Sequence, residues 1–65
     1  MNEKKALEAA IAAAGNAMRL AEHLGITSEA VYQWDKCPVA RVLEIERLTG
    51  VSRHDLRPDI YPVEA

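Results

Sequence analysis

A chain of 65 residues with a formal net charge of −2 has room for one domain, which at this size buries only about 60% of its unfolded surface. The acidic balance argues against a strongly basic nucleic-acid binder, because Lys and Arg side chains supply most non-specific affinity for DNA. No apolar run approaches the ~20 residues that span a bilayer, and the N-terminus lacks the apolar region of a secretory signal. Cys37 is the single cysteine, so no intrachain disulfide can form. We therefore expect a reducing, cytoplasmic location.

The first predicted helix covers residues 3–14. Asn2 is suited to cap its first turn, and apolar side chains recur in it at the spacing of one buried stripe. The stripe consists of Leu7, Ala10, Ile11 and Ala14. Gly15 ends this helix, and Asn16 is placed to cap the next one.

Residues 17–36 hold the most informative pattern of the chain, two short helices joined by a sharp turn. The first runs over residues 17–24, and Gly25 directly after it is a typical left-handed stop. Thr27 can cap a second helix over residues 28–36, whose first turn favours the negative charge of Glu29. The apolar side chains expected to be buried are Leu20, Leu24, Ile26, Val31 and Trp34.

The opposite side of this second helix is a row of hydrogen-bonding side chains without a large aliphatic residue: Ser28, Glu29, Tyr32, Gln33 and Lys36. A helix that only fills a bundle usually carries Lys and Glu pairs on its solvent side. The mixed face found here is instead suited to reading base edges in a groove of DNA. The alternative is a packed helical hairpin with no role in DNA binding.

A fourth helix is predicted over residues 38–49, because Pro38 suits a first helical position. Its expected buried side consists of Val42, Ile45 and Leu48, with either Val39 or Leu43. The pattern so far favours an all-α fold, a compact domain of four to five helices built around the central pair.

The C-terminal residues predict one short helical turn over 53–57 and an irregular tail over 58–65. Ser52 and Asp55 stand at the positions of a capping box. Ile60 and Tyr61 are unusual for a free tail, so they either fold back over the core or pack on a second subunit.

Two resemblances support and extend this interpretation. Small Ala21, the turn residue Gly25 and the buried positions resemble the helix-turn-helix of the Cro/CI repressor superfamily, which implies a lambda-repressor-like DNA-binding fold. The later segment is similar to YdaS-type proteins of that superfamily, which carry an antitoxin label and usually occur on prophages. Its motifs are Ile45-Glu46, Thr49-Gly50, Val51-Ser52-Arg53 and Leu56-Arg57-Pro58-Asp59. The resemblance runs from about residue 6 to residue 62 and implies a DNA-binding regulator, although the link from Trp34 to Pro38 is shorter than in many members.

Docking of such a motif places the helix over residues 28–36 in the major groove. Ser28 and Gln33 are the best base-reading candidates, because Gln can bridge adenine N6 and N7. Glu29 accepts from cytosine N4 or only stabilises the helix N-terminus. Tyr32 contacts a thymine methyl group or a phosphate, and Lys36 reaches a phosphate or a guanine.

Phosphate contacts are expected from Asn16, Ala17 and Thr27, which lie at helix N-termini, and from the side chain of Arg19. One such unit touches few bases, so we expect a homodimer on a pseudo-palindromic operator. The sequence leaves open whether the dimer forms without DNA. Its interface is expected at Ile60 and Tyr61 or on the fourth helix.

Catalysis is not expected. His23, His54 and Cys37 match no zinc-ligand spacing, no Gly-rich phosphate loop is present, and neither a cofactor nor a metal is predicted. The second function class is a small protein-interaction module, such as an antitoxin or antirepressor-binding domain, which the net charge favours. A repressor whose acidic surface also binds a toxin or antirepressor protein would combine both.

Overall fold

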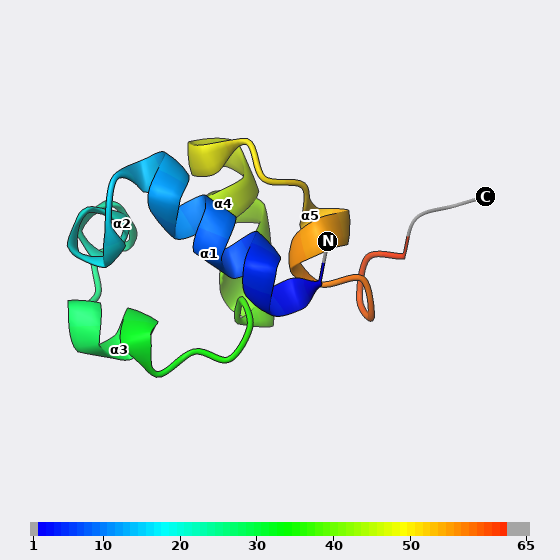
Figure 1. Cartoon of the computed structure of the whole chain (residues 1–65), viewed down its shortest axis with the longest axis horizontal. Coiled ribbons are helices and arrows are strands. Elements are labelled where there is room, and N and C mark those ends of the chain that lie inside the picture. Colours follow the sequence, from blue (N-terminus) through cyan, green and yellow to red (C-terminus); the bar gives the residue numbers. More distant parts are fainter. Residues whose placement is uncertain (1, 63–65) are drawn as a thin grey trace.

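The computed structural model describes residues 2–62, and all regular structure in this range is helical. The helices are α1 (Glu3–Ala14), α2 (Ala17–Leu24), α3 (Ser28–Tyr32), α4 (Val42–Thr49) and α5 (Arg53–Leu56), with one 3-10 turn, η1 (Val39–Arg41), before α4. In Figure 1, α1 crosses the middle of the molecule in front of α4, while α2 and α3 lie at one end and α5 at the other. The predicted all-α fold is confirmed. The last part of the predicted tail, residues 63–65, lies outside the described residues.

The first two helices begin at asparagine caps. The Oδ1 atom of Asn2 accepts a hydrogen bond from the backbone N–H of Lys5, and that of Asn16 accepts one from Arg19, each over 2.8 Å. Each cap satisfies one of the donors that a helix start leaves without an intrahelical partner. These local contacts explain why α1 and α2 begin where the sequence predicts.

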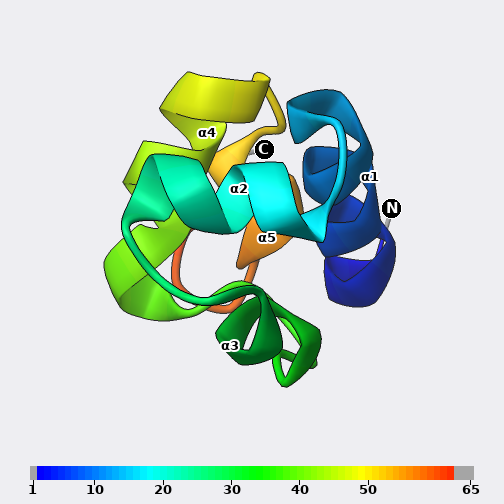
Figure 2. The same cartoon turned by 90° about the vertical axis from the view of Figure 1, so that its left-hand side faces the viewer.

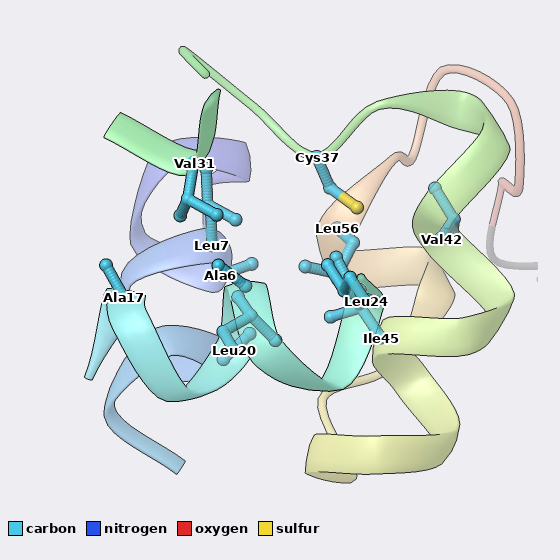
Figure 3. Close-up of a cluster of buried hydrophobic side chains, with 12 residues drawn as sticks. Ala6, Leu7, Ala17, Leu20, Leu24, Val31, Cys37, Val42, Ile45 and Leu56 are labelled. Carbon is cyan, nitrogen blue, oxygen red and sulfur yellow. The ribbon is translucent and has the colours of Figure 1, made fainter. Parts of the chain in front are cut away.

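One apolar cluster fills the space between the helices (Figure 3). Its largest fully buried side chains are Leu20, Ile45, Leu56, Val31, Val42 and Cys37. Ala6 and Ala10 of α1 are also fully buried, and such small side chains allow α1 to pack closely against α2, α4 and α5. The core is therefore mainly aliphatic and is shared by all five α-helices.

The fourth helix begins later than predicted. Pro38 is extended and precedes the 3-10 turn, and its carbonyl accepts a hydrogen bond from Arg41 N over 2.9 Å. Leu48 was expected to be buried but is 44% exposed, and the expectation that Val39 or Leu43 joins it is also wrong, because both are exposed. The reason is that α4 turns Val42 and Ile45 toward the core, and Leu48 lies at the edge of that stripe.

The short helix α5 is capped by two residues from different parts of the chain. Ser52 Oγ accepts from His54 N over 3.1 Å, and a carboxylate oxygen of Glu46 in α4 accepts from Arg53 N over 2.8 Å. The predicted capping box is therefore wrong in its partners, because Asp55 N donates to the backbone carbonyl of Ser52 rather than to its side chain. The contact from Glu46 fixes α5 to α4.

Tyr61 folds back onto the core, which is one of the two alternatives for the tail. Its N–H donates to Arg57 O over 2.8 Å, and its carbonyl lies 2.8 Å from Nδ1 of His54. The guanidinium of Arg53 lies 5.8 Å from the centre of its ring. Ile60 remains 44% exposed, so a role for it at a dimer interface stays a prediction.

Candidate nucleic-acid interface

The turn between α2 and α3 is built by Gly25. This residue has φ +72° and ψ 30°, in the left-handed region, where side chains with a Cβ are disfavoured. Its N–H donates to Glu22 O over 3.2 Å, and Ile26 N donates to Ala21 O over 3.0 Å. This pair of bonds is the Schellman arrangement that ends a helix. The half-buried Ile26 then packs against the core beneath the turn.

The faces of α3 are separated as the sequence predicts. Thr27 Oγ1 caps the helix by accepting from Ala30 N over 3.3 Å. Val31 points into the core toward α1 (Figure 3). Tyr32, at the end of the helix, is 75% exposed, and Glu29 is exposed as well. Ser28 is half-buried at the helix start, so the structure brings these three predicted base-reading residues onto one short helix.

The third helix is shorter than predicted, which changes the position of Lys36. Instead of reaching residue 36, α3 ends at Tyr32, and Gln33 is its exposed C-terminal cap residue with helical φ and ψ. Trp34 N donates to Val31 O over 3.1 Å, which tightens the last turn. The chain then leaves the helix because the side chain of Cys37 enters the core.

Lys36 is therefore in the loop after α3, and the prediction that it continues the helical row is wrong. Its Nζ atom lies 3.4 Å from Oε2 of Glu3 in α1, with both side chains partly exposed. Gln33 thus becomes the last residue of the candidate reading surface, which we define as Ser28, Glu29, Tyr32 and Gln33.

The predicted phosphate contacts lie at the starts of α2 and α3. The side-chain oxygens of Asn16 and Thr27 already accept the capping hydrogen bonds of α2 and α3. The side chain of Ala17 is buried, so a phosphate contact at this residue would use its backbone N–H. Arg19 is exposed. A Cβ placed on Gly15 would lie 2.8 Å from Cδ of Arg19, which means that the stem of this arginine lies directly over the glycine.

The charges around the candidate reading surface are mixed rather than basic. Exposed Arg19 is accompanied by three exposed carboxylates, from Glu22, Glu29 and Asp35. Elsewhere in residues 2–62, Arg41, Arg53 and Arg57 are held in ion pairs with Glu44, Glu46 and Asp59. Counting Lys36, four of the eight basic side chains are thus held by carboxylates within residues 2–62. Non-specific affinity for DNA is therefore expected to be weak.

Arg57 has a structural role that sequence reasoning did not find. Its side chain is only 11% exposed. Nη1 donates to the carbonyl of Cys37 over 3.0 Å, while Nε and Nη2 donate to the two carboxylate oxygens of Asp59 over 3.0 and 2.8 Å. The Arg-Pro-Asp run at residues 57–59 could have indicated this role, because it brings an arginine and a carboxylate together across a tight turn.

Two carboxylates that pair with arginines make the free energy of unfolding depend on pH in the acid range. The hydrogen bonds from the Arg57 side chain lower the pKa of Asp59 from 3.8 to about 2. The backbone N–H and side chain of Arg53 lower the pKa of Glu46. Since both folded-state pKa values lie below the unfolded ones, these contacts stabilise the fold above about pH 4, and the contribution is lost as the pH falls toward 2.

We therefore expect the urea midpoint of unfolding to fall between about pH 4 and pH 2. The Asp59→Asn variant should lose part of this dependence, because its residue 59 no longer titrates. Urea titrations followed by circular dichroism at several pH values provide the measurement. An identical pH profile for the two proteins would contradict the assignment to Asp59.

Groups that carry other chemistries are not gathered in this structure. Within residues 2–62, no cluster of three or more His, Cys, Asp or Glu side chains is arranged to hold a metal ion. None of the helices in this range is both long and apolar enough to cross a bilayer. His23 is exposed on α2, while burial raises the pKa of the Cys37 thiol to about 11.

Comparison with known protein families gives a match over most of the chain. A family model described as bacterial toxin YdaS matches residues 7–64, a range that includes all five α-helices except the first turn of α1. No curated protein and no solved structure matches the chain. The family places the chain among small regulatory proteins related to toxins and antitoxins. With the match extending over nearly its whole length, the chain belongs to the YdaS family.

Proposed function

We propose that this protein is a DNA-binding regulator of transcription, with α2 and α3 as a helix-turn-helix of the Cro/CI type. The observation that carries the proposal is the geometry of this pair. The left-handed Gly25 turn joins two capped helices, and Val31 anchors the second to the core. On the candidate reading surface, Glu29, Tyr32 and Gln33 are exposed and Ser28 is half-buried. A helix held in this way can enter a major groove while its partner crosses the backbone.

The reading surface is chemically suited to base edges. Gln33 supplies a donor and an acceptor that match adenine N6 and N7, and exposed Tyr32 supplies an apolar face for a thymine methyl group. With α3 only five residues long, or about one and a half turns, one copy touches few bases. We therefore expect two copies of the chain on a pseudo-palindromic operator, with half-sites about one helical turn apart. No enzymatic step is part of this proposal.

The experiment that tests the proposal is selection from a random duplex library at two salt concentrations, followed by sequencing. An enriched inverted repeat whose affinity falls as salt rises supports a dimeric operator-binding regulator. No enrichment at low salt would overturn it.

Replacing Gln33 with alanine is expected to weaken binding to the enriched duplex by roughly tenfold to a hundredfold, because a bidentate base contact contributes about 1–3 kcal/mol of discrimination. The helical circular dichroism spectrum should not change, since Gln33 is exposed. Titration of labelled duplex measures the loss. The matched control is Ala12→Gln on the exposed side of α1, which changes polarity without changing charge. Equal affinity of the Gln33 variant and the control would count against base reading by α3.

The acidity around α3 favours a second candidate, a protein-interaction module. Glu22, Glu29 and Asp35 are exposed on α2, on α3 and in the loop after α3, and three carboxylates suit a basic protein surface better than phosphates. A toxin or antirepressor would be such a partner. This function is supported if wild-type protein selects no duplex at low salt and instead forms a complex with a purified basic partner. The Glu29→Gln variant should then weaken that complex.

A further inference from the structure

The orientation of α3 depends on the segments at its two ends. The helix is five residues long and packs mainly against α2. Figure 2 shows it below α2 and separate from α4, with the chain returning to the body of the molecule through the loop at residues 33–38. At its start, α3 is fixed by the Gly25 turn. At its end, its position is determined by how this loop is held.

Two polar contacts join the loop to distant parts of the described chain. Lys36 pairs with Glu3 over 3.4 Å, but both side chains are partly exposed, and exposed pairs contribute little. The contact from Arg57 Nη1 to the Cys37 carbonyl is different, because the arginine is largely buried and the two residues are 20 positions apart. Both carboxylate oxygens of Asp59 accept hydrogen bonds from the same guanidinium. This bidentate contact fixes the plane of the guanidinium as well as its position.

We propose that Arg57, oriented by Asp59, is a positioning residue for α3. By holding the Cys37 carbonyl it fixes the loop after Gln33, and so sets how Tyr32 and Gln33 are presented. The inference deepens the proposed function, and in its consequences for DNA it rests on that function. It assigns the Leu-Arg-Pro-Asp run a positioning role at the C-terminal end of α3, while the Gly25 turn fixes the N-terminal end. The run needs no contact of its own to a base.

The chain offers a matched control for this role. Arg53 forms a similar arginine–carboxylate pair with Glu46, over 3.0 Å, and it lies in the same C-terminal segment. Its backbone N–H and its Nε atom both donate to Glu46 of α4, and within residues 2–62 it makes no hydrogen bond to the loop at residues 33–38. Arg57→Gln and Arg53→Gln therefore each remove one ion pair, but only the first releases the loop.

Trp34 reports on the loop directly, because it is the only tryptophan and lies half-buried in that segment against the core. At a temperature where circular dichroism shows every variant fully folded, we expect Arg57→Gln to shift Trp34 emission to longer wavelength and to increase acrylamide quenching. Arg53→Gln should leave both unchanged. If Arg57→Gln does not fold, Asp59→Asn takes its place, because it keeps the arginine but replaces the two-oxygen, charged contact with a single neutral acceptor. Equal Trp34 signals for the loop-releasing variant and Arg53→Gln would overturn the inference.

The affinity for the enriched duplex is the second readout. Arg57→Gln is expected to weaken specific binding by roughly tenfold or more, the equivalent of about one lost base contact, with non-specific binding unchanged. Arg57→Lys should recover part of the loss, because an ammonium can donate to the carbonyl but cannot hold both oxygens of Asp59. A Trp34 shift in a protein that selects no duplex would leave the positioning role standing and overturn the DNA function. Specific binding by wild type, together with no Trp34 shift in Arg57→Gln, would support the DNA function and overturn the positioning role.

Discussion

Replacing Leu20 with alanine is expected to lower the free energy of unfolding by about 2–5 kcal/mol, the range found when a fully buried leucine is truncated. Leu20 has no exposed surface and is more deeply buried than Leu24, the other leucine that α2 gives to the core. A domain of 65 residues has a total stability of only roughly 3–10 kcal/mol at about 0.05–0.15 kcal/mol per residue. The variant should therefore be partly or fully unfolded at moderate temperature. Urea unfolding followed by circular dichroism measures the difference.

Leu48→Ala is the matched control for this experiment, since the same side chain is removed from an exposed position on α4. Its unfolding free energy should stay within about 0.5 kcal/mol of wild type. If both leucine variants unfolded at the same urea concentration, the packing of α2 at the centre of the core would be wrong.

Replacing Gly25 with valine is expected to destabilise the fold by about 1–3 kcal/mol, the cost of holding a non-glycine residue in the left-handed region. A Cβ on Gly25 would meet no atom within 4 Å, so crowding adds nothing to this cost. Valine should be the most damaging choice because β-branched residues are outliers at positive φ. Melting temperatures from circular dichroism provide the measurement.

The Gly25→Asn variant separates backbone strain from other causes. Asparagine adopts the left-handed conformation far more readily than valine does, so its melting temperature should lie close to that of wild type. Equal losses for asparagine and valine would mean that the side chain itself, rather than the sign of φ, disrupts the turn.

Helices whose limits are set by neighbouring residues could be predicted from the sequence. α1 and α2 begin at Asn2 and Asn16 and end at glycines, and all four signals lie within one turn of the boundary they determine. The end of α3 could not be found in this way. It depends on burial of Cys37 and on the hydrogen bond from Arg57, 20 positions later in the chain, and no local pattern encodes such a contact.

The same distinction applies to the candidate site. A helical phase that places Val31 inside also places Tyr32 and Glu29 outside, so these positions followed from periodicity. Lys36 was misplaced because the periodicity was extended beyond the true end of the helix. Trp34 was expected to be buried and is only half-buried, because it lies in the loop rather than on the inner face of α3.

The burial of Cys37 has a consequence for how the protein responds to oxidants. The thiol has no exposed surface, and its pKa of about 11 keeps it protonated at neutral pH, whereas oxidants and alkylating agents react with the thiolate. Modification must therefore wait for the loop at residues 33–38 to open. The rate at which the chain's only thiol reacts is thus governed by a conformational equilibrium, and the folded protein should tolerate oxidative conditions that inactivate proteins with accessible cysteines.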